Sequence, residues 1–247
     1  MDGSRPAVVL VPRGGAWGDR VAAAARARGL EPRIVPLITD APPADTGPLD
    51  RALRRLADHR WLVVTSATTV RVVAERTPRL PAGLRVAAVG RATARAARDA
   101  GWQVDLVPDD ESAAGLVAAL PDPDGSVLVP RSAIAAPTLV DGLRARGIDV
   151  EDVVAYRTVE TGDAPVVPGP GPAYVLVTSG SVAEQVARRM TPLDPGTRIA
   201  CIGPGTADAA RALGLPVHVV ARDRSAEALL DAVVETLPPE PRTGRSS

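Results

Sequence analysis

Polar residues that could bind an anion follow several short apolar runs of this sequence. A glycine lets the backbone approach a ligand closely, and a hydroxyl at a helix start fixes the end whose dipole favours a carboxylate. Arginine adds a cation whose planar fork matches carboxylate geometry. The candidate substrate-binding residues of this kind are Arg13, Thr65, Ser66, Gly90, Thr93, Arg131, Thr178, Ser179, Gly203 and Thr206.

Each of these candidates also has a purely structural interpretation. Thr93 and Thr206, three residues after a glycine, are expected at helix N-caps and could serve only that purpose. The two Thr-Ser pairs could have no role beyond starting helices, and the two arginines could be solvated charges at strand ends. Because the threonines and the Thr-Ser pairs recur at matching places in both halves of the chain, we favour the binding interpretation for them, whereas both interpretations of Arg13 and Arg131 stay open.

Tyr156 is the candidate catalytic residue. It ends the run VVAYRT and is one of two tyrosines in the chain. A phenol that faces a cleft can donate a hydrogen bond or act as a weak general acid. The alternative is a half-buried aromatic residue on a strand, and we expect that role for Tyr174.

The charge balance and the rare residue types exclude several functions. The chain of 247 residues has 29 basic and 29 acidic side chains and no net charge, which argues against a general nucleic-acid or membrane-surface binder. Every basic residue is arginine, so a Schiff-base lysine, a P-loop lysine and a pyridoxal phosphate anchor are absent. One cysteine and two histidines give no basis for a disulfide or a metal site.

Other sequence signals are weak or negative. Cys201 and His218 lie in strand patterns and are expected in the core, whereas His59 beside Asp58 is expected to form a solvated pair. The segment 203–208 resembles a dinucleotide fingerprint but ends in aspartate, which disfavours a nucleotide-binding protein. With no signal peptide and no apolar stretch of membrane-spanning length, we expect a soluble cytoplasmic protein.

Short β-branched runs alternate with segments of helical spacing, a pattern typical of α/β proteins with parallel sheets covered by helices. The expected strands are 8–11, 33–38, 61–64, 85–89, 104–107, 127–129, 150–156, 174–177, 198–202 and 217–220. Helix candidates between them are 18–28, 93–100, 112–120, 138–146, 182–189, 206–213 and 226–236. The tail from Pro238 is expected to be disordered.

The second half of the chain repeats the first. VVLVPR at 8–13 matches SVLVPR at 126–131 at an offset of 118, and later segments match at an offset of 113. One interpretation is two doubly wound domains in series, about 1–121 and 122–247. The other is an exchange of chain between lobes, because the Pro/Gly-rich stretches 41–48 and 161–172 lie within the halves, after the second strand of each.

The ordered set of motifs resembles the uroporphyrinogen-III synthase family over roughly residues 7–237. The motifs are VLVPR at 9–13 and again at 127–131, VVTSATTV at 63–70, VAAVGRATARAARDAGW at 86–102, VEDVVAYRTVE at 150–160, VLVTSGSV at 175–182 and IACIGPGTADAARALGL at 199–215. Two departures are Gly205, where members often carry a hydroxyl residue, and Ala67-Thr68-Thr69, which is not the commonest continuation.

This resemblance implies two flavodoxin-like lobes joined by a two-stranded hinge, with a substrate cleft between them. Lobe one would comprise 1–38 and 159–247, and lobe two 39–158, with the strands near Val35 and Val154 forming the hinge. The implied reaction is cofactor-independent closure of hydroxymethylbilane, a linear tetrapyrrole with eight carboxylates, to uroporphyrinogen III with inversion of the last ring. By this resemblance Tyr156 matches the tyrosine proposed to assist departure of the hydroxyl. The residues that match positions lining the family's cleft are Thr65, Ser66, Thr93, Ser179, Ser181 and Thr206.

Neutrality of the chain is compatible with such a substrate, because helix N-termini and backbone amides bind carboxylates without net positive charge. We expect a monomer with no nucleic-acid or membrane partner. A non-catalytic homologue that binds a tetrapyrrole in a regulatory role would carry the same motifs and is the alternative.

Overall fold

A computed structural model describes residues 6–167 and 173–237 of the chain. The predicted tail from Pro238 lies outside these described residues. Contacts divide the chain into two compact units, with unit 1 formed by Met1–Thr39 and Val159–Ser247 and unit 2 formed by Asp40–Thr158. Unit 1 therefore contains both ends of the chain, whereas unit 2 is one continuous segment.

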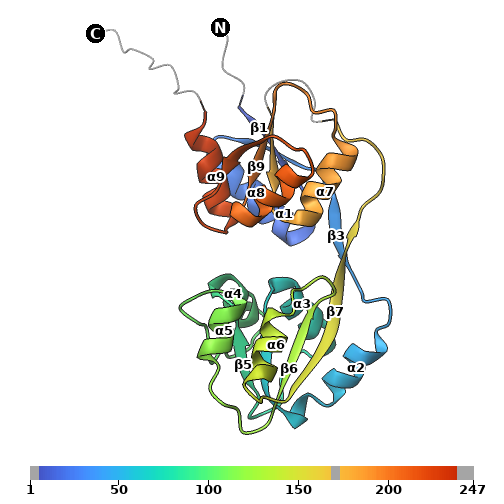
Figure 1. The fold of residues 1–247 in the computed structure, drawn as a ribbon, viewed down its shortest axis with the longest axis vertical. Coiled ribbons are helices and arrows are strands. Elements are labelled where there is room, and N and C mark those ends of the chain that lie inside the picture. Colours follow the sequence, from blue (N-terminus) through green and yellow to red (C-terminus); the bar gives the residue numbers. More distant parts are fainter. Residues whose placement is uncertain (1–5, 168–172, 238–247) are drawn as a thin grey trace, which may run out of the picture. The chain divides into compact units, whose positions relative to one another are not determined.

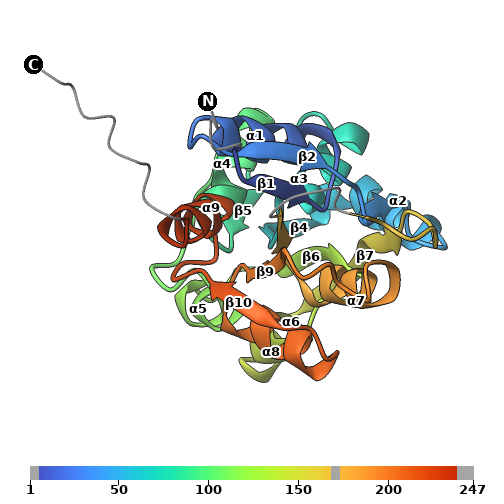
Figure 2. The ribbon, with the colours of Figure 1, turned by 90° about the horizontal axis from the view of Figure 1, so that it is seen from above.

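Unit 1 contains a five-stranded sheet of order β10-β9-β8-β1-β2, whose neighbouring strands are parallel. Figure 1 shows that this unit combines blue elements from the beginning of the sequence with orange and red elements from its end. Helices α1 and α9 pack on one face of this sheet, and α7 and α8 pack on the other (Figure 2). Because both faces are covered, the central strands β1 and β8 are continuous apolar runs. The elements are β1 (Val8–Val11), α1 (Gly15–Arg26), β2 (Glu31–Ile34), β8 (Ala173–Val177), α7 (Gly180–Arg189), β9 (Thr197–Cys201), α8 (Pro204–Ala212), β10 (Val217–Val220) and α9 (Ala226–Glu235).

Unit 2 carries a second sheet, of order β3-β7-β6-β4-β5. Helices α2, α3 and α4 cover one face, and α5 and α6 cover the other. Within β4 the side chains alternate between the faces, since Leu62 and Val64 join the first cluster and Trp61 and Val63 the second. The elements are β3 (Ile38–Ala41), α2 (Gly47–Arg54), β4 (His59–Val64), α3 (Ala67–Arg76), β5 (Arg85–Ala88), α4 (Arg91–Asp99), α5 (Ala113–Ala119), β6 (Ser126–Ser132), α6 (Thr138–Ala145) and β7 (Val150–Glu160).

The predicted α/β fold class with two parallel sheets is confirmed, but the division into consecutive halves is wrong. Strand β1 pairs in parallel with β8, which places the N-terminal segment in the same sheet as the C-terminal half. The boundaries between the units fall within β3 and β7, which are neighbours in the second sheet. The first of these strands begins at Ile38, three residues after the position near Val35 that the sequence suggested.

Two predicted strands are wrong, for different reasons. The expected strand 33–38 is two strands, β2 and β3, because the chain passes here from the sheet of unit 1, where β2 pairs with β1, into the sheet of unit 2, where β3 is the neighbour of β7. The expected strand 104–107 contributes only a single bridge between Leu106 and Ala87. Here the side chain of Asp105 accepts the Val86 N–H at 2.8 Å, in the place of the backbone carbonyl oxygen that would accept it in a continued ladder.

The internal repeat is visible in the ends of the helices. Gly29 and Gly147, at an offset of 118, both follow a helix with φ near +75° (74° and 79°), and Gly101 and Gly214 do so at an offset of 113 (82° and 77°). This left-handed conformation ends a helix and favours glycine. The helix starts repeat as well, because the N-cap serines of α3 and α7 and those of α5 and α9 each accept a backbone N–H.

Candidate functional site

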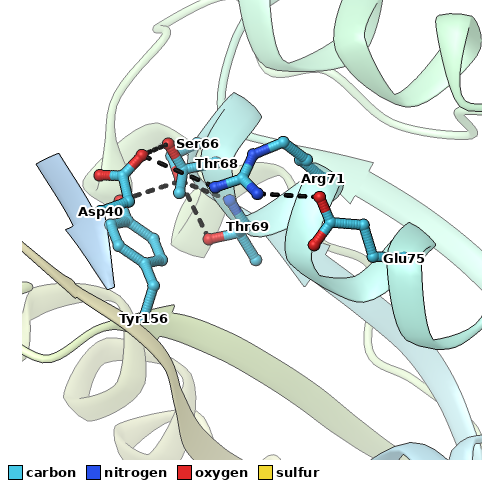
Figure 3. Close-up of polar contacts among 7 residues, drawn as sticks. All are labelled: Asp40, Ser66, Thr68, Thr69, Arg71, Glu75 and Tyr156. Atoms are coloured by element: carbon cyan, nitrogen blue, oxygen red, sulfur yellow. Dashed lines mark hydrogen bonds and ion pairs between the residues drawn. The ribbon is translucent and has the colours of Figure 1, made fainter. Parts of the chain in front are cut away.

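Tyr156 and Ser66 lie together at the carboxyl end of the sheet in unit 2. Ser66 is the N-cap of α3, and its Oγ accepts the Thr69 N–H at 3.0 Å. The same Oγ lies 3.2 Å from the Tyr156 hydroxyl and 2.9 Å from Thr69 Oγ1 (Figure 3). The helix start therefore holds the phenol by a hydroxyl that also caps the helix. Thr65, partly buried, precedes Ser66 in the link from β4 to α3.

A β-bulge directs Tyr156 toward α3. Arg131 of β6 is opposite Val154, and the next residue, Ser132, is opposite Tyr156, so β7 contains one extra residue at this point. Strict alternation would place Ala155 and Tyr156 on opposite faces. Both instead contact the hydrophobic cluster under α2, α3 and α4, as expected where a bulge redirects a side chain.

Acidic and basic side chains surround the first turn of α3. Thr68 Oγ1 donates to Asp40 Oδ2 at 3.1 Å, and Arg71 lies 3.8 Å from the same oxygen. Arg71 also forms an ion pair with Glu75 at 2.9 Å, one helical turn further along α3 (Figure 3). These contacts link α3 to β3, the strand in which the chain enters unit 2.

The start of α4 carries a carboxylate of the chain itself. Gly90 is the N-cap, and a β-carbon added there would lie 2.3 Å from Glu111 Oε2. That oxygen accepts the Arg91 N–H at 3.0 Å, and the other pairs with the exposed Arg91 side chain at 2.5 Å. The predicted close approach at Gly90 is thus made by Glu111. The prediction of Thr93 as the N-cap is wrong, because this residue is buried in the first turn of α4.

Arg131 is paired with one acidic residue of its own unit, Asp152. Its Nε and Nη2 atoms donate to Asp152 Oδ2 at 2.9 and 2.8 Å, and Arg144 donates to Asp152 Oδ1 at 2.7 Å. Burial acts to raise the pKa of the Asp152 carboxyl, but the hydrogen bonds from the two arginines outweigh it and lower this pKa below its ordinary value. An anion would reach Arg131 only in competition with Asp152.

Unit 1 presents the corresponding residues at its own sheet. Ser179 caps α7 and accepts the Val182 N–H at 3.3 Å, while Thr178 and Ser181 beside it are partly buried. Gly203 caps α8, which makes the prediction of Thr206 as the cap wrong; Thr206 is buried within α8.

The surroundings of Gly203 differ from those of Gly90. A β-carbon at Gly203 would lie 3.2 Å from the Arg224 side chain, and the equivalent neighbour of Gly90 is Glu111. Residues 111 and 224 are related by the repeat offset of 113. The two units therefore place opposite charges beside equivalent helix starts.

Arg13 follows β1 and lies over the ring of Trp17, with 5.9 Å between its guanidinium carbon and the ring centroid. The loop is tightly folded, because a β-carbon at Gly18 would lie 2.2 Å from the Arg13 carbonyl oxygen. Glycine is therefore required at position 18 for α1 to start where it does.

The rare residues are placed partly as predicted. Cys201 is fully buried, as expected, and burial raises the pKa of its thiol to about 11. His218 is exposed rather than in the core, and its Nδ1 accepts the Ile199 N–H at 3.0 Å. His59 is buried rather than solvated, with its Nδ1 2.8 Å from Ser126 Oγ. Within 6–167 and 173–237, no helix is long and apolar enough to cross a membrane.

Four residues of these arrangements, Asp40, Thr69, Glu111 and Asp152, were not among the sequence candidates. Only Glu111 had a detectable signal, because it is the acidic counterpart of Arg224 in the repeat. Asp40 and Asp152 act through contacts between separate segments, such as the 28 residues that separate Asp40 from Thr68, and Thr69 is distinguished by its complete burial beside Ser66.

A family model described as uroporphyrinogen-III synthase HemD matches residues 19–231. The chain is 28% identical over 158 residues to uroporphyrinogen-III synthase of Synechococcus elongatus, with 61% of this chain and 60% of that protein covered. It is 26% identical over 227 residues to porphyrin biosynthesis protein HemD of Ruminiclostridium josui, with 85% of this chain and 44% of that protein covered. The chain thus spans about half the length of these two relatives.

Further relatives are covered more completely. The chain is 28% identical over 250 residues to the chloroplastic uroporphyrinogen-III synthase of Oryza sativa subsp. japonica, with 94% and 81% of the two chains covered. The crystal structure of uroporphyrinogen-III synthetase from Helicobacter pylori shares the fold with a TM-score of 0.65, at 18% identity and with 93% and 99% covered. From the match over residues 19–231, this chain belongs to the uroporphyrinogen-III synthase family.

Proposed function

We propose that this chain is a uroporphyrinogen-III synthase, a cyclising lyase that needs no cofactor. It converts hydroxymethylbilane into uroporphyrinogen III and water. The observation that carries the proposal is the contact between Tyr156 and the N-cap Ser66, which gives one phenol a fixed place beside a helix start. The names of the relatives in Synechococcus elongatus and rice support the same activity.

The reaction begins with departure of the terminal hydroxyl. Tyr156 donates its phenolic proton to that oxygen, the C–O bond breaks with its electron pair, and water leaves. The pyrrole nitrogen lone pair forms the new exocyclic double bond of an azafulvenium ion. The substituted carbon of the last ring attacks this ion to give a spiro intermediate, which fragments and recloses with the ring inverted. Loss of one ring proton at the end balances the proton donated at the start.

The protein's main task in this reaction is to hold one conformation of an octa-anion. Helix starts bind carboxylates through unpaired N–H groups and the positive end of the helix dipole. We assign this role to the N-terminal turns of α3, α7 and α8, with Arg13 assisting. The hydroxyl and glycine residues assigned with them are Thr65, Ser66, Thr178, Ser179, Ser181, Gly203 and Thr206.

The proposed binding set is completed by Gly90, Thr93 and Arg131, at places where acidic side chains of the chain itself already make contacts. Glu111 occupies the start of α4, and Asp152 pairs with Arg131. Substrate carboxylates would have to displace these two side chains, so we expect smaller contributions from the three residues than from the helix starts of α3, α7 and α8.

A coupled assay with freshly prepared hydroxymethylbilane tests the proposal. Products are oxidised and separated into isomers III and I, since uncatalysed closure gives isomer I. Isomer III above the background of an enzyme-free reaction supports the synthase. Isomer I alone, at the uncatalysed rate, refutes it and leaves the non-catalytic homologue.

Tyr156→Phe tests the role of the phenol. We expect a lower turnover that is not abolished, because conformational control remains after the proton donor is lost. Tyr174→Phe is the matched control, since Tyr174 is buried with its hydroxyl 2.9 Å from Thr236 Oγ1 and should affect stability alone. An unchanged rate in Tyr156→Phe would remove Tyr156 from the mechanism.

A further inference from the structure

Three hydroxyl groups form a chain at the start of α3, from Thr69 through Ser66 to Tyr156 (Figure 3). A serine hydroxyl has one proton to donate and two lone pairs to accept. One lone pair of Ser66 accepts the Thr69 N–H at 3.0 Å, which is fixed by the helix cap. One proton and one lone pair remain for two hydroxyl neighbours, so Ser66 donates to one of them and accepts from the other.

The two possible directions have different consequences for Tyr156. If Tyr156 donates to Ser66, its proton is already engaged, and Ser66 donates to Thr69. If Thr69 donates to Ser66, then Ser66 donates to the phenolic oxygen, and the Tyr156 proton is available to another acceptor. Only the second direction leaves Tyr156 ready to act as an acid.

Burial of Thr69 selects between these directions. Thr69 is completely buried, and among the described residues Ser66 Oγ is the hydrogen-bond partner of its hydroxyl. In the first direction the Thr69 proton would have no acceptor inside the protein, and an unpaired buried donor is strongly disfavoured. In the second direction only acceptor capacity is unused, which is less unfavourable.

We propose that Thr69 is a positioning residue that orients the Tyr156 hydroxyl by donating to Ser66, so that the phenolic proton is free for the departing hydroxyl of the substrate. Thr69 acts through Ser66 and does not touch the substrate. The role in turnover rests on the proposed function, whereas the direction of the hydrogen bonds does not depend on it.

Nuclear magnetic resonance of tyrosine labelled with carbon-13 at Cζ measures the hydrogen bonding of each phenol. The chain has two tyrosines, so two resonances are expected, and Tyr174→Phe assigns them. We expect Thr69→Val to move the Tyr156 resonance, because the hydroxyl that fixes Ser66 as a donor to the phenol is then lost. Thr69→Ser restores the donor and should return the resonance to the wild-type position.

Thr68→Val is the matched local control. Its hydroxyl belongs to the same helical turn but donates to Asp40, so the Tyr156 resonance should stay in place. A shift of equal size in Thr68→Val would show a general disturbance of the helix start and overturn the proposal. An unmoved resonance in Thr69→Val would overturn it as well. If Thr69→Val does not fold, Thr69→Ala provides the same comparison.

Turnover gives the second measurement. We expect Thr69→Val to lower kcat about two- to twelve-fold, the change that corresponds to one net hydrogen bond, with KM unchanged and Thr69→Ser near wild type. An unchanged kcat in an active enzyme would overturn the positioning role. If the wild type forms no isomer III, the proposed function fails, and the Tyr156 resonance alone then decides the direction of the hydrogen bonds.

Discussion

Replacement of Gly90 by alanine should separate Glu111 from the start of α4. A β-carbon at position 90 would lie 2.3 Å from Glu111 Oε2 and 3.1 Å from its Cβ, which is too close for both groups to stay in place. The backbone itself accepts alanine, because the φ of −172° is an extended conformation. The substitution therefore acts through the displaced carboxylate and through the weaker N-cap.

The expected magnitude follows from these two effects. Loss of the hydrogen bond between Arg91 N–H and a carboxylate at a partly exposed helix start costs about 1 kcal/mol. Alanine in place of glycine at an N-cap costs about 0.5–1 kcal/mol more. We expect Gly90→Ala to lower the free energy of unfolding by about 1.5–2 kcal/mol.

A double-mutant cycle with Glu111→Ala isolates the contact. Glu111→Ala alone should cost about 1 kcal/mol, and the double variant should cost about 1.5–2 kcal/mol because the hydrogen bond is lost only once. The coupling free energy is then about 1 kcal/mol. Urea unfolding of unit 2 can be followed by Trp61 and Trp102 fluorescence in a Trp17→Phe background, since the third tryptophan lies in unit 1.

The equivalent pair in unit 1 is the matched control. Gly203→Ala meets only the flexible Arg224 side chain at 3.2 Å, with no carboxylate to displace. The cycle of Gly203→Ala with Arg224→Ala should therefore be additive, measured by circular dichroism. Additivity within about 0.5 kcal/mol for the pair in unit 2 would refute the reasoning, because it would mean that Glu111 does not support the helix start.

Two further predictions concern stability and reactivity. Asp152→Asn should lower the free energy of unfolding by about 1 kcal/mol at pH 7. Because the arginines lower the pKa of Asp152 in the folded state, its contribution to stability is present above the ordinary value of 3.8 and is lost as pH falls through the lower folded value. The difference in the free energy of unfolding between the wild type and Asp152→Asn, measured in urea, should therefore be smaller at pH 3 than at pH 7. An equal difference at both pH values would contradict the assignment. Burial raises the pKa of the Cys201 thiol to about 11, so the thiol should react with iodoacetamide at pH 8 about 100-fold more slowly in the native protein than in the urea-unfolded protein. Mass spectrometry measures both rates, and equal rates would show an accessible thiol.

Local apolar patterns predicted most of the strands, because helices cover both faces of each sheet. Apolar runs such as 8–11 and 61–64 have no other stable place than a buried strand. Prediction failed at 104–107, where the Asp105 side chain accepts the Val86 N–H, and at 33–38, where the chain passes from the sheet of unit 1 into the sheet of unit 2. These effects depend on partners that a periodicity count does not contain.

The site was predicted as a set of residue types but not as a set of contacts. Tyr156 was conspicuous in the sequence, yet its contact with Ser66 joins residues 90 positions apart and depends on a bulge in β7. Thr69 resembled an ordinary helix residue, and its significance comes from complete burial beside Ser66. At α4, the sequence predicted that a ligand approaches Gly90 closely, and the group that lies there in the structure is Glu111.

The division of the chain has a consequence for the order in which the protein can fold during synthesis. All strands of unit 2 are present once Glu160 has been made, so its sheet can form while the rest of the chain is still missing. Strands β1 and β2 are made first but must wait for β8, which begins at Ala173. Prior folding of unit 2 brings its two ends onto adjacent strands and shortens the loop that β1 and β8 must close, which lowers the entropic cost of completing unit 1.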